Sequence, residues 1–323
     1  MKHIVRYREE IVSYLDKLTL IKEPKELYEP VDYILNIGGK RLRPVLTLFS
    51  AEVFGSSSKE AIYAATAIEM FHNFSLMHDD IMDDAPLRRG QQTVHEKWNL
   101  NTGILSGDAM LIMAYQYFEN YEPEVFRELA KLFSKTSLEV CEGQQLDINF
   151  ETRDSVSIPE YIRMIDYKTA VLVGAAFEMG AIVAKASKED RESIYDFGRY
   201  LGIAFQLQDD YLDAFGDPET FGKQIGGDIL ENNKTYLYLK PLENADDLQR
   251  KKLQEWFSVT EQSVEKVEKV KELYVETNVV VDSEKMIEEY TNKALAILEN
   301  LNIDSEYKNE LKEFSLNLMK RTV

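Results

Sequence analysis

The chain has 323 residues, of which 44% are hydrophobic, enough to form a large buried core. Its net charge of −19 argues against nucleic-acid binding, which needs a basic surface, and no apolar stretch is long enough to predict a transmembrane segment. A single cysteine, Cys141, excludes an intramolecular disulfide, fits a reducing, cytoplasmic compartment and is expected in the core.

Helical periodicity of the apolar residues covers almost the whole chain, and no segment shows the alternation that predicts a strand. We therefore expect an all-α fold, a single-domain helical bundle around a central cavity spanning residues 1–323. Ser157 with Glu160, Asp282 and Asp304 are placed to cap helices. The predicted helices are 4–18, 24–37, 41–54, 59–83, 95–119, 123–147, 158–185, 188–214, 233–241, 246–280, 284–300 and 304–320.

The first functional motif is a glycine-led cluster of cations at 38–44, Gly-Gly-Lys-Arg-Leu-Arg-Pro. Glycines let a backbone approach a phosphate closely, and arginine binds phosphate oxygens bidentately. Alone, the motif is more typical of an exposed helix start than of a phosphate site. A second cation pair, Arg88-Arg89, follows later in the chain and strengthens the case for an anionic ligand.

Aspartates recur with one spacing, in the segments 79–83 and 209–213. Carboxylates at i, i+1 and i+4 of a helix lie within an arc of roughly 100°. Acidic runs are most often solvated, but both segments lie in apolar sequence, where unpaired carboxylates are costly to bury. Oxygen ligands with room for water and phosphate suit Mg²⁺, which predicts a phosphorylated substrate.

Two histidines precede the first aspartates. His72 lies about 20° around the helix from Asp79 and is expected on the same face, although a lone histidine is more often a core residue. His78 suggests a histidine-aspartate metal phosphohydrolase as an alternative, but such a site needs more ligands than the four histidines of the chain offer. Two cation groups with two aspartate clusters favour two diphosphates in one cavity, as in a two-substrate condensation.

In combination, the motifs resemble the trans-isoprenyl diphosphate synthases, the polyprenyl synthetase family. They read GGKRLRP (38–44), HNFSLMHDDIMDDAPLRRG (72–90), GQQLD (143–147), KT (168–169), FQLQDDYLD (205–213) and GK with a later NNK (222–234). The resemblance implies the isoprenoid synthase type I fold, about three Mg²⁺, and condensation of isopentenyl diphosphate with an allylic diphosphate. It also implies a homodimer. The catalytic motifs lie within 38–234, and the helices of 246–320, which contain none of these motifs, are expected to support the structure.

The resemblance further assigns roles to individual residues. Metal binding is implied for Asp79, Asp83 and Asp209 as direct ligands and for Asp80, Asp210 and Asp213 as ligands or water binders. The diphosphate of isopentenyl diphosphate is expected at Lys40, Arg43, His72 and Arg89. The allylic diphosphate is expected at Arg88, Lys168, Thr169, Gln206, Lys223 and Lys234, of which Lys168, Thr169 and Gln206 are the catalytic candidates. Gln144 and Asp147 resemble a supporting pair behind these residues.

Product length is expected to depend on the residues just before Asp79. In the family, the fifth and fourth positions before this aspartate limit the growing chain, and here they are Phe74 and Ser75. The resemblance favours a C20 product, geranylgeranyl diphosphate, with C15 next. The alternative is that Phe74, about 140° from Asp79 around the helix, packs against a neighbouring helix as an ordinary core aromatic.

Two other functions share some of these features. A class I terpene cyclase also has a DDxxD motif, but Asp213 and the 38–44 motif disfavour it. An inactive subunit that modulates an active synthase typically loses one aspartate motif, and both are intact here.

Overall fold

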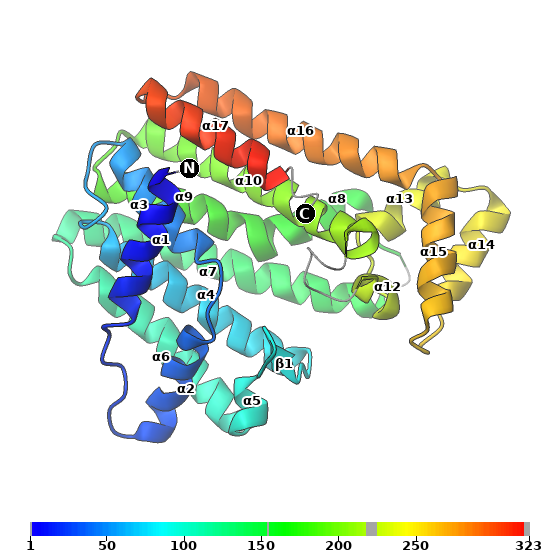
Figure 1. Ribbon diagram of the computed structural model, residues 1–323, viewed down its shortest axis with the longest axis horizontal. Helices are drawn as coiled ribbons and strands as arrows, with labels where there is room; N and C mark the ends of the chain where they lie inside the picture. Colours follow the sequence, from blue (N-terminus) through cyan, green and yellow to red (C-terminus); the bar gives the residue numbers. More distant parts are fainter. Residues whose placement is uncertain (1, 154, 218–224, 320–323) are drawn as a thin grey trace. The chain divides into compact units, whose positions relative to one another are not determined.

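The protein is described by a computed structural model that covers residues 2–153, 155–217 and 225–319. These residues form almost entirely helices (Figure 1), so the all-α prediction is confirmed. Contacts within the chain define two compact units. Unit 1 comprises the described residues up to Ser134 together with Ala176–Glu192, and unit 2 comprises Lys135–Ala175 and the described residues from Ser193 onward. A single domain over the whole chain stays a prediction.

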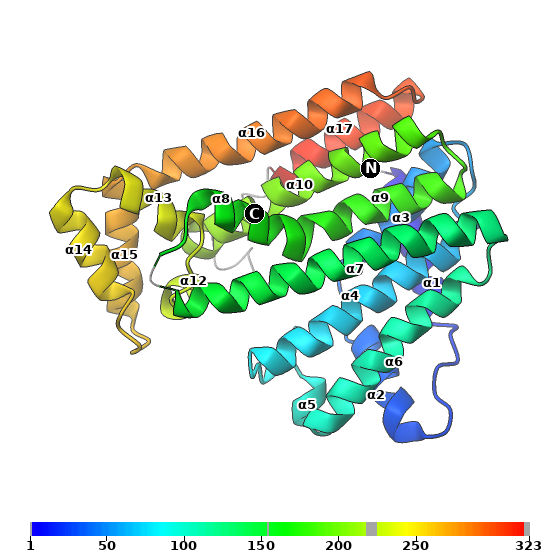
Figure 2. The same cartoon turned by 180° about the vertical axis from the view of Figure 1, so that it is seen from behind.

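Unit 1 contains six complete helices and parts of three more. The complete ones are α1 (Lys2–Leu15), α2 (Lys25–Asn36), α3 (Leu42–Val53), α4 (Ile62–Met82), α5 (Val94–Lys97) and α6 (Leu100–Phe118). The boundary between the units falls within α7 (Pro123–Thr152), α9 (Val171–Val183) and α10 (Lys188–Phe215). Helices α4 and α6 lie side by side in both views (Figures 1 and 2).

The core of unit 1 is aromatic and closely packed. The ring of Phe133 contacts those of Phe71 and Phe118 edge-on, with centroids 5.2 Å apart in each pair. Helix α3 approaches α9 closely enough for Thr47 Oγ1 to donate to the carbonyl of Ala176 at 2.8 Å. Gly180 permits this approach, because a Cβ there would lie 2.3 Å from the carbonyl oxygen of Thr47. The packing fixes α3 and α4, which carry the first set of candidate site residues.

Unit 2 holds the remaining helices around its own core. They are α8 (Ile158–Ile165), the π-helix η1 (Asp166–Ala170), α12 (Gly227–Leu230), α13 (Tyr236–Asn244), α14 (Asp247–Trp256), α15 (Val264–Glu276), α16 (Val279–Asn300) and α17 (Ser305–Met319). Buried side chains of α8, α10, α13, α15 and α16 meet in one hydrophobic cluster. Helices α16 and α17 run beside each other (Figures 1 and 2).

Capping residues account for several helix ends. Ser157 and Glu160 form the predicted capping box of α8, and Asp304 accepts from the backbone N–H of Glu306 at 2.8 Å before α17. The prediction that Asp282 caps a helix is wrong, because α16 begins one turn earlier, after Asn278. Val279 is fully buried there, and its packing extends the helix N-terminally.

Four further expectations need correction. A strand pair was not predicted, but β1 (Leu87–Arg88) and β2 (Gln91–Gln92) form a two-stranded antiparallel hairpin, too short to show an alternating pattern. The predicted helix 158–185 is interrupted by η1, and 246–280 is two helices. Cys141 is exposed on α7 and not in the core. Within the described residues, no helix combines the length and apolar character needed to span a membrane.

Candidate active site

The first aspartate motif ends α4 in unit 1 and presents its three carboxylates differently. Asp79 is half-buried and Asp83 is exposed, whereas Asp80 is 2% exposed. Arg88 on β1 binds Asp80, with Nε 2.9 Å from both carboxylate oxygens and Nη2 2.7 Å from Oδ1. Asp80 therefore anchors Arg88. The sequence had assigned Asp80 to a metal ion and Arg88 to the allylic diphosphate, but the two residues contact each other directly.

The hairpin between β1 and β2 aims Arg89 at the glycine-led loop. Arg89 and Gly90 form its turn with φ of 53° and 76°, the left-handed conformation that tight hairpins use. The Arg89 guanidinium donates to the carbonyl of Gly38. A Cβ on Gly39 would lie 2.6 Å from Arg89 Nη1, so this glycine makes room for the guanidinium. The sequence had suggested room for a phosphate instead.

Arg43 and His72 form the next pair, with Arg43 Nη1 3.1 Å from His72 Nε2. Burial and the neighbouring arginines, Arg43 first and then Arg89, hold the pKa of His72 well below its usual value, so Nε2 accepts from Arg43. Burial also lowers the pKa of Arg43 to about 10. Its buried Nε has no hydrogen-bond partner in the described structure. A cation with an unsatisfied buried donor fits an anion at this position.

Arg41 differs from its neighbouring cations because it faces inward. It is 9% exposed and donates through Nη1 to Glu69 Oε1 at 2.5 Å and through Nη2 to the carbonyl of Leu35. Asn73 also donates to Glu69 Oε1, at 3.1 Å. Arg41 thus holds the loop before α3 in place, while Lys40 beside it is exposed.

The second aspartate motif, on α10 in unit 2, repeats the alternation of exposure. Asp209 and Asp213 are half-buried and Asp210 is 6% exposed. Asp210 accepts hydrogen bonds from the hydroxyl of Tyr161 and from Gln206 Nε2, the latter at 3.0 Å. Burial, reinforced by the nearby Asp228, raises the pKa of Asp210 to about 8.

Gln206 and Asp213 link the motif to its surroundings. Gln206 Oε1 accepts from the hydroxyl of Thr169 at 3.2 Å, which brings two catalytic candidates together. Asp213 Oδ2 accepts from the backbone N–H of Asp228 at 3.0 Å, and its carbonyl accepts from Gly226 at 2.7 Å. Gly226 has a φ of 81°, which favours glycine at this turn.

Lys168 and Thr169 lie in the π-helix η1, a type of helix that often occurs at functional sites. Lys168 Nζ pairs with Asp147 Oδ2 at 2.6 Å, joining two residues that the sequence had singled out. Gly143 allows the contact between α7 and η1, because a Cβ there would lie 2.2 Å from the backbone nitrogen of Lys168. Arg199 anchors the start of η1 through Asp166, with Nε 2.7 Å from Oδ1.

The structure places Lys234 at the end of α7. Its Nζ donates to the carbonyls of Phe150 at 2.8 Å and Arg153 at 2.5 Å, which are oxygens left over at a helix C-terminus. Lys234 therefore neutralises a helix end in this conformation. Lys223, expected at the same diphosphate, lies outside the described residues.

Phe74 and Ser75 lie on α4, one turn before Asp79. The Phe74 ring lies 4.7 Å from that of His78 and 5.5 Å from that of Phe71, centroid to centroid. His78 Nε2 is 3.2 Å from the carbonyl oxygen of Ile104 on α6, so this face of α4 is directed to α6. Ser75 donates to the carbonyl of His72 at 2.9 Å. A role in product length stays a prediction.

The donor set in each unit fits Mg²⁺. Each aspartate motif presents its first and third carboxylates at or near the surface and holds the middle one in internal hydrogen bonds. Carboxylate oxygens with water completing the coordination sphere are the ligands that Mg²⁺ prefers. Asp79 with Asp83 in unit 1, and Asp209 with Asp213 in unit 2, are therefore the residues suited to hold it.

A sequence model of the polyprenyl synthetase family matches residues 24–276, more than half of the chain. The chain belongs to the polyprenyl synthetase family. The match includes every motif described above, and a polyprenyl synthetase is a transferase of prenyl groups.

Individual members of the polyprenyl synthetase family are similar over most of the chain. A geranylgeranyl diphosphate synthase of Methanosarcina mazei is 41% identical over 233 residues, 72% of either chain. A crystal structure of a geranylgeranyl pyrophosphate synthase is 55% identical, covers 98% of both chains and has a TM-score of 0.95. The Corynebacterium glutamicum geranylgeranyl pyrophosphate synthase, solved with isoprenyl diphosphate and magnesium, is 27% identical, with a TM-score of 0.85 and 99% coverage of both chains.

Several residues that organise this polyprenyl synthetase carry no signal in the sequence. Tyr161 binds Asp210 and Glu69 binds Arg41, yet each is separated from its partner by tens of residues and belongs to no spaced pattern. Arg199, the partner of Asp166, is similarly distant along the chain. Of the residues that hold a candidate site residue in place, only Asp147 could be identified from the sequence, because its motif resembles a motif of the family.

Proposed function

We propose that the chain is a Mg²⁺-dependent geranylgeranyl diphosphate synthase that condenses isopentenyl diphosphate head-to-tail onto an allylic diphosphate. The observation that carries the proposal is the repeated aspartate pattern, with its first and third carboxylates presented outward and the middle one held inside. Membership of the polyprenyl synthetase family supports the reaction, and similarity to geranylgeranyl diphosphate synthases supports the C20 product.

Unit 1 would bind the diphosphate of isopentenyl diphosphate through Lys40, Arg43, His72 and Arg89. The buried Nε–H of Arg43 has no hydrogen-bond partner in the described structure, and Nη1 of the same guanidinium donates to His72 Nε2. Because His72 is neutral, it orients Arg43 without adding a competing charge. Gly39 gives Arg89 space beside the same loop. Arginine forks of this kind suit diphosphate oxygens.

The allylic diphosphate would be bound by Arg88, Lys168, Lys223 and Lys234 and by about three Mg²⁺ held at Asp79, Asp80, Asp83, Asp209 and Asp213. Bound Mg²⁺ would stabilise the negative charge that develops on the leaving diphosphate. Of these aspartates, Asp80 acts mainly by fixing Arg88, as their bidentate contact supports. Lys234 would have to leave the carbonyls at the end of α7 to reach a diphosphate.

In the proposed reaction the allylic C–O bond breaks and its electron pair leaves with the diphosphate. The double bond of isopentenyl diphosphate then supplies the electrons of the new C–C bond, and the departed diphosphate takes up the proton whose loss restores a double bond. The Thr169 hydroxyl and the Gln206 amide, hydrogen-bonded to each other, would stabilise the passing cation with their oxygens. Neither is nucleophilic enough to trap it readily.

The assay for this proposal combines the purified protein with Mg²⁺, labelled isopentenyl diphosphate and allylic diphosphates of five, ten and fifteen carbons. Chromatography of the dephosphorylated products should give the C20 alcohol. Predominance of C15 would correct the product, whereas no prenyl product from any starter would contradict the function. A hydrocarbon from farnesyl diphosphate alone would indicate a cyclase.

Phe74 is proposed to limit the product from its position on α4. Phe74→Ala should lengthen the main product by at least one five-carbon unit, because it opens the wall beside Phe71 and His78. Ser75→Ala, which removes only a hydroxyl bonded within the helix, is the matched control and should leave the product unchanged. An unchanged product in Phe74→Ala would remove this residue from the role.

A homodimer is proposed because α6 exposes an apolar stripe. Leu100, Ile104, Leu105 and Ile112 lie within an arc of about 140° around this helix and are 53%, 40%, 59% and 61% exposed. Light scattering should give twice the chain mass, and Leu105→Asp with Ile112→Asp should halve it. A monomeric wild-type protein would contradict the proposal.

A further inference from the structure

His95 on the short helix α5 is buried without a hydrogen-bond partner. Its side chain is 7% exposed, and neither ring nitrogen has a hydrogen-bond partner in the described structure, although Nε2 lies within ion-pair distance of Glu96. Leaving a buried donor or acceptor unsatisfied costs about 1–3 kcal/mol. A neutral imidazole has one of each, so this ring is placed for a ligand that the protein itself does not supply.

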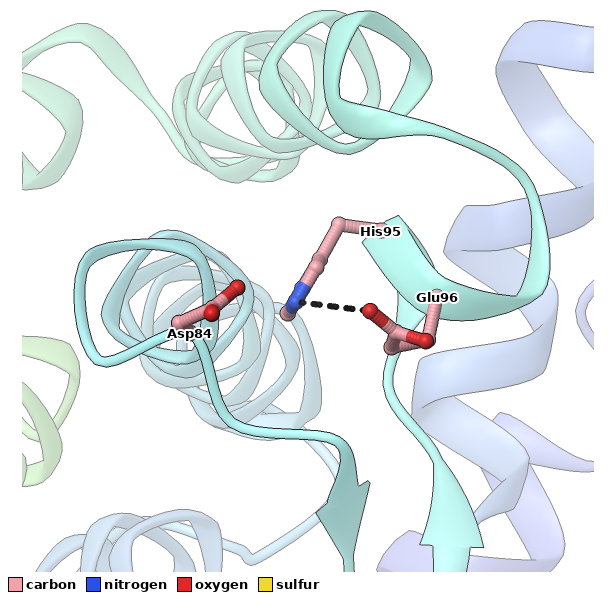
Figure 3. A group of neighbouring side chains, drawn as sticks. All are labelled: Asp84, His95 and Glu96. Carbon is pink, nitrogen blue, oxygen red and sulfur yellow. Dashed lines mark ion pairs between the residues drawn. The ribbon is translucent and has the colours of Figure 1, made fainter.

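Two carboxylates converge on the same ring. One ligand atom from each of Asp84, His95 and Glu96 can be chosen so that all three lie within 4.8 Å of one another. Figure 3 shows the imidazole between the two carboxylates, with its Nε2 3.9 Å from Glu96 Oε1. Two anionic groups and a buried nitrogen thus share one small volume in unit 1.

The backbone around this group is held in place. Asp84 follows the end of α4 in the left-handed conformation, with φ of 49°, which turns it away from the helix axis. Thr93, just before α5, donates its hydroxyl to the carbonyl of Ala85 at 2.8 Å and its N–H to that of Pro86 at 3.1 Å. These bonds join the two ends of the loop that carries Asp84 and His95.

We propose that Asp84, His95 and Glu96 bind one Zn²⁺, at a site distinct from the Mg²⁺-binding aspartates. One imidazole nitrogen with two carboxylate oxygens is a borderline ligand set that suits Zn²⁺ at about 2.0–2.2 Å, with water completing the tetrahedron. Tetrahedral geometry needs ligand atoms about 3.3 Å apart. The exposed side chains of Asp84 and Glu96 can close by the required distance. Mg²⁺ prefers oxygen ligands and would not use the imidazole.

The ion would have a structural consequence for the diphosphate-binding loop. Asp84 lies at the end of α4 and His95 on α5, so a shared ion closes the segment between them, which includes the hairpin of Arg88 and Arg89. Closing a loop with a metal restricts the motion of the residues inside it. Zn²⁺ would therefore hold the hairpin without contacting the substrate.

The test measures, by equilibrium dialysis, how much Zn²⁺ the protein binds. Excess Mg²⁺ is present to compete for the sites that have oxygen ligands alone. Wild-type protein should hold one more equivalent of Zn²⁺ than His95→Gln or Glu96→Gln. X-ray absorption at the zinc edge should show one imidazole nitrogen among oxygen ligands. The matched controls, His3→Gln and Glu119→Gln, change the same residue types elsewhere and should retain the wild-type amount.

The proposal is overturned if wild-type protein and both site variants bind equal Zn²⁺, or if the bound ion lacks a nitrogen ligand. His95 is buried, so His95→Gln is checked for folding by circular dichroism. If that variant is unfolded, Glu96→Gln decides, because the Glu96 carboxylate is 47% exposed and its change does not disturb packing.

Discussion

In the first aspartate motif the middle carboxylate, Asp80, is buried against the guanidinium of Arg88, whereas in the second motif Asp210 is buried against the phenol of Tyr161 and the amide of Gln206. The first environment supplies a counter-charge. Among the described residues, the second supplies neutral donors, with Asp228 nearby, and burial with this second carboxylate raises the pKa of Asp210 to about 8. Identical spacing in the sequence therefore yields two electrostatically different sites.

The difference teaches that the outer and middle aspartates of each motif serve different purposes. The outer ones are half-buried or exposed and are the carboxylates suited to hold metal, while the middle ones are buried against neighbouring side chains. Asp80 holds the guanidinium of Arg88, and Asp210 accepts from Gln206, which in turn accepts from Thr169. Substitutions should distinguish the outer aspartates from the middle ones. Replacing an outer aspartate is expected to have the same effect in both motifs, whereas replacing a middle aspartate is expected to have a different effect in each.

The largest expected effect is on turnover and is common to both motifs. Asp79→Ala and Asp209→Ala should each lower kcat by about 100- to 1,000-fold or more, because each removes a ligand for the ion that stabilises the leaving group. Folding stability without metal should hold or rise, since like-charge repulsion is relieved. Steady-state kinetics and urea unfolding measure both. Glu268→Gln, an exposed change on α15, is the control, and turnover near wild type in either alanine variant would refute the assignment.

A smaller effect should distinguish the motifs by stability. Asp80→Asn should lower the free energy of unfolding by about 2 kcal/mol, between the values for exposed and fully buried ion pairs, because Arg88 loses its counter-charge but is 23% exposed. Urea unfolding in metal-free buffer gives the value. Asp108→Asn removes a carboxylate that is 62% exposed and should change stability by less than about 0.5 kcal/mol. Equal effects of the two changes would mean that the Asp80–Arg88 pair contributes nothing.

The smallest effect concerns pH and Asp210. Its pKa is raised on folding, so its favourable contribution to stability is complete below about pH 4 and is lost as pH rises to about 8. Asp210→Asn should therefore gain stability relative to wild type as the pH rises from 5 to 8 in chelator-treated protein. Denaturant unfolding at a series of pH values measures this. Parallel curves for wild type and Asp210→Asn would contradict the assigned environment of Asp210.

Much of the fold follows from local sequence. Apolar periodicity placed most helices, and the capping box at Ser157 and Glu160 gave the start of α8. The break at η1 was missed because an i→i+5 turn leaves no distinct period in the pattern of apolar residues. The hairpin at Leu87–Gln92 was missed because two residues per strand are too few for an alternation.

The candidate site, like the fold, was predicted only in part from the sequence. The spacing of Asp79, Asp80 and Asp83 correctly predicted one helix, but not that the middle carboxylate turns to Arg88. Partners such as Phe150 for Lys234 depend on the tertiary fold, which spacing along the chain does not encode. Residue types thus predicted the chemistry, whereas the partner of each charge required the structure.

The π-helix at Asp166–Ala170 also has a consequence for how this chain can vary. A π-turn contains one residue more than an α-turn, so deleting a residue within it would let α8 and α9 run as one regular helix. That deletion would rotate α8 by about 100° relative to α9 and turn Tyr161 away from Asp210. Insertions and deletions should therefore be excluded from the whole of this segment, and not only substitutions at Asp166, Lys168 and Thr169.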